Sequence, residues 1–234
     1  MNQETNPDRS LFTIERFQDY EGESRANLLR VIGVAAFYSI HYLHYHKVEL
    51  GALQFADVEI SPRFHLMVSV ICAAWTLMSL SVLVCLKSFQ LPAWVKYATT
   101  AGDLLLLTAV LCVGNGAKSP IVIGYLLILI IAALRFNLVL IRAATVTAMF
   151  GYLTVLACAR WPHLINRDSL DTVPRYEQLV TLVAIGLCGI MLGQIIRRTR
   201  SLVFALAEQA RDPKAAMANQ IESSDSEGST EESA

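Results

Sequence analysis

Charged residues are scarce in this chain, and those present are unevenly spread. Asp, Glu, Lys and Arg make up 17% of the 234 residues, whereas a soluble domain carries about 25%. Hydrophobic residues make up 54%, and they occur in long blocks rather than at amphipathic spacing. The sequence therefore predicts an integral membrane protein whose main partner is the lipid bilayer. Basic residues form only short clusters beside the apolar blocks, so we expect no binding of nucleic acid.

Motifs for catalysis and metal binding are also lacking. The sequence contains no Ser-His-Asp pattern, no paired carboxylates, no phosphate-binding Walker loop and no kinase signature. The five cysteines lie in apolar blocks without a CxxC pair, which is typical of small buried side chains. We therefore predict no enzyme activity, no catalytic residues and no metal site, and the sequence identifies no cofactor.

Six apolar blocks have about the length of a membrane-spanning helix, which is roughly 20 residues. The fold class we predict is an all-α integral membrane protein with a bundle of six transmembrane helices. The blocks cover residues 28–45, 64–86, 97 to the Gly114 turn, 121–135, 138–159 and 176–196. Ser61 and Pro62 form a helix start before the second block.

The distribution of positive charge predicts the orientation. An even number of spans places both termini on one side of the membrane. With six spans, most lysines and arginines lie on the side of the two termini. They include Arg197, Arg198 and Arg200 directly after the last span. The positive-inside rule then places both termini in the cytoplasm.

Four segments follow from this layout. We predict a cytoplasmic segment at 1–27, which forms a short amphipathic helix on the membrane or stays a loosely ordered tail. The membrane domain covers 28–196. A cytoplasmic extension of helix six covers 197–212, because no helix breaker occurs before Pro213. Residues 213–234, rich in Ser, Glu and Asp, are expected to be a disordered acidic tail.

Asp103 is the first candidate site residue, because it lies about six residues inside the third block. That corresponds to roughly 9 Å along a helix, and an acid at the membrane centre costs about 2.5–3.5 kcal/mol. We therefore expect Asp103 to face the bundle and to have a partner, and Arg135 and Arg142 flank the nearest short loop. A proton or ligand site and a structural pair between helices both remain open.

His41 and His44 are the second candidates, since two histidines three positions apart share one helix face. Together they have the spacing to present imidazoles to one metal or haem iron. Tyr38, Tyr42 and Tyr45 are interleaved with them. A helix end rich in Tyr and His is also typical of anchoring at the membrane surface, so both interpretations stay open.

Two glycine patterns predict close approaches of the backbone. Gly114, Gly116, Ser119 and Pro120 form a tight turn between the third and fourth blocks, where glycine permits positive φ and proline starts a helix. Gly186, Gly189 and Gly193 form a smooth stripe on the sixth block. Such a stripe packs against another helix of the same chain or forms a homodimer.

The hairpin from Asp103-Leu-Leu-Leu-Leu-Thr108 through Gly114-Asn-Gly-Ala-Lys-Ser-Pro120 into an apolar fourth block resembles a known family. It is similar to the six-span input domains of bacterial membrane histidine kinases and of some class III adenylate cyclases. In the redox-sensing branch, a Gly-Gly-x-x-Asn-Pro-Phe segment is linked to quinone binding, and here the residues are Gly114-Asn-Gly116 and Ser119-Pro120-Ile121. The resemblance implies a bacterial cytoplasmic (inner) membrane protein that senses a signal. No phosphoacceptor-helix or ATP-lid motif follows the sixth block, so we expect an input module without a catalytic output domain.

The leading hypothesis is therefore a non-catalytic sensor-like or regulatory protein. It would act through the arginine-rich extension of helix six on a cytoplasmic signalling enzyme. The alternatives are a membrane protein that binds a hydrophobic cofactor, either quinone or haem, and a small transporter.

Overall fold

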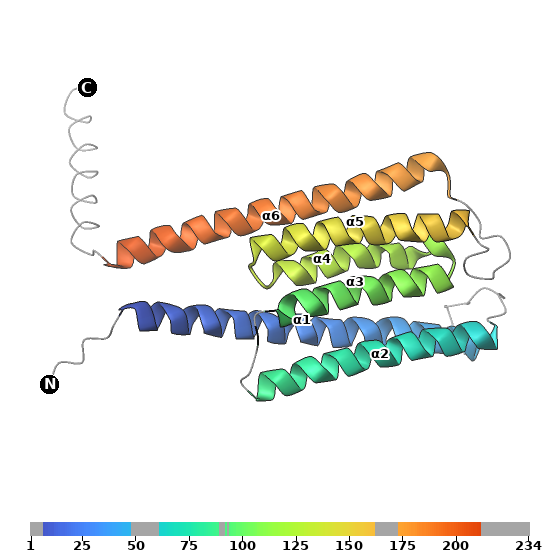
Figure 1. Cartoon of the computed structure of the whole chain (residues 1–234), viewed down its shortest axis with the longest axis horizontal. Coiled ribbons are helices and arrows are strands. Elements are labelled where there is room, and N and C mark those ends of the chain that lie inside the picture. Colours follow the sequence, from blue (N-terminus) through green and yellow to red (C-terminus); the bar gives the residue numbers. More distant parts are fainter. Residues whose placement is uncertain (1–6, 48–60, 89–91, 93, 162–172, 212–234) are drawn as a thin grey trace, which may run out of the picture. The chain divides into compact units, whose positions relative to one another are not determined.

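A computed structural model describes residues 7–47, 61–88, 92, 94–161 and 173–211, and every structural statement below refers to these residues. They form helices and turns without a strand, which confirms the all-α prediction. In chain order (Figure 1) the elements are α1 (Pro7–Tyr45), α2 (Pro62–Lys87), α3 (Val95–Val113), the 3-10 helices η1 (Gly116–Lys118) and η2 (Pro120–Ile123), α4 (Gly124–Ala133), α5 (Leu138–Arg160) and α6 (Arg175–Arg211).

Five of the described helices are long and apolar enough to cross a membrane. They include residues Tyr20–Tyr45 of α1, all of α2, α3 and α5, and residues Arg175–Val203 of α6. This set indicates a multi-pass membrane protein. The predicted fourth span is shorter, because its apolar helix covers only Pro120–Ala133. Six full-length crossings therefore stay a prediction.

α1 is longer than the sequence analysis predicted. It is one helix of 39 residues that begins at Pro7, so the predicted boundary at 27/28 lies inside it. Only Gly22 interrupts an otherwise helix-compatible sequence between Pro7 and Leu28, and a single glycine does not end a helix that packs against neighbours. The polar residues from Pro7 are therefore helical and continuous with the apolar residues of α1.

The start of α2 follows the sequence prediction closely. The Ser61 hydroxyl accepts a hydrogen bond from the Phe64 amide, and Pro62 occupies the first helical turn. Asn137 caps α5 in the same way by accepting from the Leu140 amide. These caps satisfy amide groups that have no partner within the helix.

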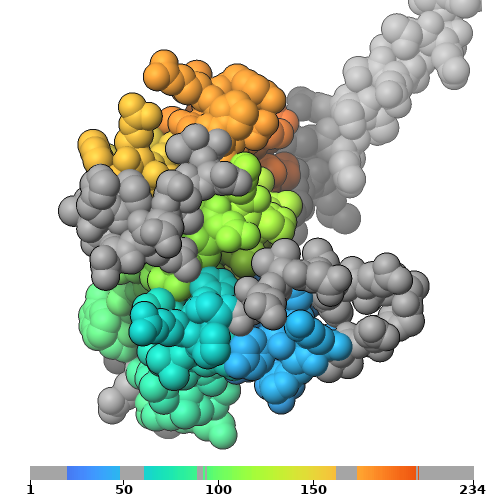
Figure 2. Space-filling view, turned by 90° about the vertical axis from the view of Figure 1, so that its right-hand side faces the viewer, coloured from blue at the N-terminus to red at the C-terminus, as the bar shows by residue number. Residues whose placement is uncertain are grey.

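The chain divides into two compact units, residues 1–193 and 194–234. In the first unit α1 lies beside α2, and both Figure 1 and the view along the helices in Figure 2 show this pair. α3 contacts α2 on one side and α5 on the other, with α4 beside both α3 and α5. Leu104, Leu107 and Leu111 of α3 are therefore almost fully buried, whereas large apolar side chains such as Leu66 and Leu179 point outward, as expected for lipid contact.

α6 is continuous from Arg175 to Arg211, as the lack of a breaker before Pro213 predicts. The unit boundary at 193/194 falls within this helix, near the predicted boundary at 196/197. The division into 1–27, 28–196, 197–212 and 213–234 stays a prediction, and the acidic tail at 213–234 lies outside the described residues.

The glycine stripe of α6 faces α5 of the same chain. A Cβ atom added at Gly189 would lie 2.1 Å from Thr145 Oγ1, and one at Gly193 would lie 3.6 Å from Leu138 Cδ1. A Cβ at Gly186 would approach Met149 Sδ to 3.9 Å. The stripe therefore packs within one chain, and nothing in the structure supports a homodimer through it.

We predict that Gly189→Ala destabilises the protein. The new methyl group would overlap Thr145, and overpacking of this kind costs about 1–3 kcal/mol. Gly33→Ala is the matched control, because a Cβ there meets nothing within 4 Å and alanine favours a helix. Thermal unfolding of the detergent-solubilised protein should show a lower midpoint for Gly189→Ala alone. Equal midpoints for the two variants would contradict the close α5–α6 contact.

Candidate functional site

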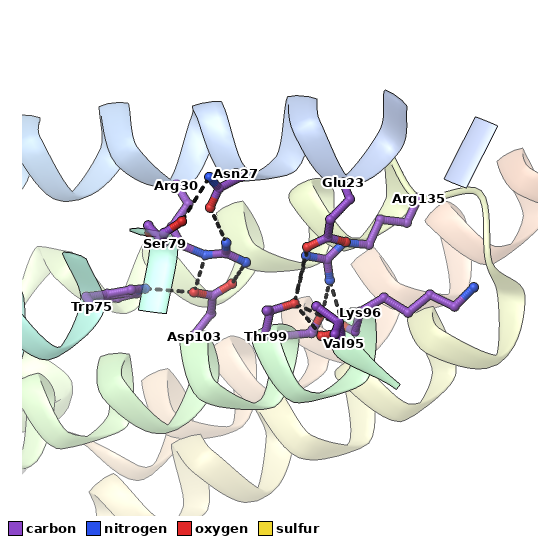
Figure 3. Close-up of polar contacts among 11 residues, drawn as sticks. Glu23, Asn27, Arg30, Trp75, Ser79, Val95, Lys96, Thr99, Asp103 and Arg135 are labelled. Atoms are coloured by element: carbon purple, nitrogen blue, oxygen red, sulfur yellow. Dashed lines mark hydrogen bonds and ion pairs between the residues drawn. The ribbon is translucent and has the colours of Figure 1, made fainter. Parts of the chain in front are cut away.

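Two buried ion pairs tie α1 to α3 and to the turn after α4 (Figure 3). Arg30 Nε lies 2.7 Å from Asp103 Oδ1, and Arg30 Nη2 lies 2.8 Å from Asp103 Oδ2. Arg135 Nη2 lies 2.8 Å from Glu23 Oε1. The four side chains are only 1–4% exposed. We call these four residues and their hydrogen-bond partners the paired-charge network.

The Arg30–Asp103 pair is completed by groups from α1 and α2. Trp75 Nε1 donates to Asp103 Oδ1 at 2.7 Å. Arg30 Nη1 donates to Asn27 Oδ1 at 2.8 Å, and Asn27 Nδ2 donates to the Ser79 carbonyl at 3.2 Å. Asp103 therefore accepts three hydrogen bonds, two of them in the bidentate geometry that gives arginine its strongest pairing with a carboxylate. The cluster joins α1, α2 and α3.

The Arg135–Glu23 pair lies beside the first turns of α3. Arg135 Nη1 donates to the Lys96 carbonyl at 2.7 Å and to the Thr100 hydroxyl, and Nη2 donates to the Thr99 hydroxyl at 2.9 Å. Burial lowers the pKa of the Arg135 guanidinium, and the Glu23 carboxylate opposes this effect. Because arginine normally titrates above pH 12, Arg135 remains a cation. Among the described residues, Arg135 Nε is a buried side-chain nitrogen that has no hydrogen-bond partner.

Helical spacing explains how α1 serves both pairs. Glu23, Asn27 and Arg30 are related by i, i+4 and i+7, so they lie on one face of the helix. Glu23 and Arg30 are separated by roughly 10 Å along the axis, at about 1.5 Å per residue. Beside Glu23, a Cβ on Gly22 would lie 3.1 Å from the Leu134 carbonyl oxygen. The absent side chain thus lets α1 approach the turn that carries Arg135.

The structure corrects our choice of partner for Asp103. Asp103 is buried and paired, as expected, but its partner is Arg30 rather than Arg135 or Arg142. Arg135 is held at the first turns of α3 by Glu23 and by the Lys96 carbonyl. Arg142 is exposed on α5. The paired arrangement favours the structural alternative over a proton or ligand site.

His41 of α1 contacts His65 of α2. His41 Nε2 lies 3.2 Å from Nδ1 of His65 on α2, and the Tyr45 ring stacks on His65 with centroids 3.9 Å apart. Tyr38 Oη lies 3.2 Å from Ser69 Oγ on the same side of α2. The part of the chain that is described contains no group of three or more His, Cys, Asp or Glu residues able to hold a metal ion. His41 therefore joins α1 to α2.

The predicted hairpin turn is present. Gly114 ends α3, and Gly116 has a φ of +60°, a conformation that favours glycine. Ser119 accepts a hydrogen bond from the Ile121 amide, and Pro120 begins η2.

On α6, the side chains of Arg197, Arg198 and Arg200 are exposed. A surface that binds a partner needs such exposed side chains.

Of the network, the sequence prediction included only Asp103 and Arg135, so Glu23, Asn27, Arg30, Trp75 and the remaining hydrogen-bond partners were missed. The i, i+4, i+7 spacing of Glu23, Asn27 and Arg30 was a signal that the sequence contained. It was overlooked because Glu23 and Asn27 were assigned to a separate polar segment. Nothing in the sequence singles out Trp75.

The chain matches no protein-family model, no curated protein and no solved structure. What the protein does must therefore be inferred from its own residues.

We predict that Asp103→Leu and Arg30→Met each destabilise the protein by about 3–5 kcal/mol, because either leaves a buried charge unpaired. The double variant removes both charges, so it should be more stable than either single variant. Arg142→Met is the control at an exposed position and should change little. Unfolding in a denaturing detergent measures all four. A double variant that loses the sum of the single effects would contradict a direct pair.

Proposed function

We propose that this chain is a non-catalytic sensor-like or regulatory membrane protein that acts on a cytoplasmic signalling enzyme through the charged end of α6. The observation that carries the proposal is the continuity of α6. One helix contains the apolar residues that approach α5 at Gly189 and extends into the exposed Arg197, Arg198 and Arg200. A helix without a break transmits a rotation or shift of its apolar part to its charged part.

The paired-charge network supports a sensor over a proton or ion carrier. Both described buried acids of the network, Glu23 and Asp103, are bound to arginines. These charge-assisted hydrogen bonds give both carboxylates a structural role between helices. The network instead holds α1, α2 and α3 together as a fixed unit.

The proposal includes six membrane crossings with both termini in the cytoplasm of a bacterial cell. Contacts at the ends of the α3–α4 hairpin support it. Arg135, which follows α4, donates to the carbonyl of Lys96 at the start of α3, so the second arm returns to the level at which the first begins. The first residues of this arm are 3-10 helix, which rises about 2.0 Å per residue, and the long Arg135 side chain covers the remaining distance.

We predict that fluorescent-protein fusions to either terminus will fluoresce in bacterial cells, because the fused domain stays in the cytoplasm. Alkaline phosphatase fused at Lys118 should be active outside it, and at Arg142 inactive. If α4 does not cross, the two termini lie on opposite sides, and one terminal fusion will be dark. That result would contradict the six-span arrangement.

We predict that a histidine kinase or nucleotide cyclase co-purifies with the full chain from its native membrane in a fixed molar ratio. Replacing Arg197, Arg198 and Arg200 by Gln should reduce that ratio at least tenfold, because the charged surface is removed. Arg142→Gln is the control and should leave it unchanged. Quantitative mass spectrometry measures the ratio, and gel filtration checks that each variant is folded.

Deleting residues 197–234 should have the same effect while membrane insertion is retained. Undiminished recovery of the enzyme with this deletion would refute a role for the end of α6. Absence of any such enzyme from the purified full chain would refute the proposal itself.

A further inference from the structure

Two cysteines from different helices lie against each other near the end of the α3–α5 contact. Cys112 is on α3 and Cys158 is on α5, and their Sγ atoms are 3.4 Å apart. Both are free thiols, and both are half-buried. The other three cysteines, Cys72, Cys85 and Cys188, are also free thiols.

We propose that Cys112 and Cys158 form an oxidisable dithiol, which a hydroperoxide converts into a disulfide between α3 and α5. A disulfide requires the sulfurs to be about 2.0 Å apart, so they must approach by about 1.4 Å. Small rotations of the two side chains supply much of this change. The proposal does not depend on the function proposed above.

The helices are already held close together one turn before Cys112 on α3 and about two turns before Cys158 on α5. Thr108, one turn before Cys112, shares a 2.8 Å hydrogen bond with Tyr125 Oη of α4. A Cβ on Gly151 of α5 would lie 2.7 Å from Thr108 Oγ1 and 3.1 Å from Tyr125 Oη. The missing side chain at Gly151 thus permits the close approach of α5 to α3. This close packing of α3 and α5 places the second thiol beside the first.

This placement determines the chemistry. In the first step the sulfur of one thiol attacks an oxygen of a hydroperoxide, and the O–O bond breaks. The sulfur is oxidised to a sulfenic acid, and the hydroperoxide is reduced to an alcohol or to water. In the second step the other sulfur attacks the sulfenic sulfur. An S–S bond forms, the S–OH bond breaks, and the hydroxide leaves with the thiol proton as water.

The pair lies near the ends of two apolar helices. Cys112 is next to the last residue of α3, and Cys158 is two residues before Arg160, the last residue of α5. Both sulfurs therefore lie near helix ends, within apolar segments. The disulfide would fix the end of α3, the helix that carries Asp103, to the end of α5, the helix on which α6 packs.

The test uses the full-length protein in lipid vesicles, treated with hydrogen peroxide in one arm and cumene hydroperoxide in the other. The protein is then denatured, and its free thiols are counted with a mass-tagged maleimide. We expect two of the five thiols to be lost in at least one arm and recovered after reduction with dithiothreitol. The arm that reacts identifies the water or the lipid as the source of oxidant.

Variants and peptide mapping assign the bond. Cys112→Ser and Cys158→Ser should each abolish the loss of the thiol pair, whereas a triple Cys72→Ser, Cys85→Ser, Cys188→Ser variant should retain it. Tandem mass spectrometry of the oxidised natural protein should find the 112–158 linkage within one chain, which needs no variant to fold. No disulfide in either arm, a linkage between two chains or a linkage to another cysteine would overturn the proposal.

Discussion

The arrangement of α1, α2 and α3 depends on the pairing of four charges in an apolar surrounding. A charge that is removed from water must be neutralised by a partner at hydrogen-bond distance, because the apolar medium offers no other compensation. Arg30 with Asp103 and Arg135 with Glu23 meet this requirement at 2.7–2.8 Å. Apolar side chains fix the packing of neighbouring helices by their shapes, and charged pairs add a directional contact. A bidentate ion pair between two helices permits only one register.

Other features of the first unit are consistent with this constraint. The face of α1 that carries Glu23, Asn27 and Arg30 is turned toward α2 and α3. Gly22 leaves room for the turn that carries Arg135. Phe136, directly after Arg135, has a positive φ. The chain reverses there, and α5 begins two residues after Phe136. Packing on α5 then positions the apolar part of α6.

Much of the helical layout was readable from the sequence, whereas the network was not. The apolar blocks predicted the membrane helices α2, α3, α5 and α6, and Ser61-Pro62 marked the start of α2. The true start of α1 was missed because the polar residues near Glu23 and Asn27 resemble a surface segment. A buried acid at Asp103 predicts a basic partner, but the choice among Arg30, Arg135 and Arg142 depends on helix packing. Likewise, no spacing rule brings His41 to His65 or Cys112 to Cys158, since each pair joins two different helices.

The charges on α1 have a consequence for how the protein enters the membrane. The most apolar 18-residue window of Tyr20–Tyr45 has a mean hydropathy of only 1.2, against 2.2 for the corresponding window of α2. Its charges Glu23 and Arg30 each oppose insertion, by about 2.5–3.5 kcal/mol for a charge at the membrane centre. Asp103, the partner of Arg30, is synthesised about 70 residues after it. Arg135, the partner of Glu23, is synthesised about 110 residues after it. α1 is therefore a weak membrane segment until α3 and the turn after α4 have left the ribosome. The buried environment of Glu23 and Arg30 is thus complete only when α3 and the turn after α4 are in place.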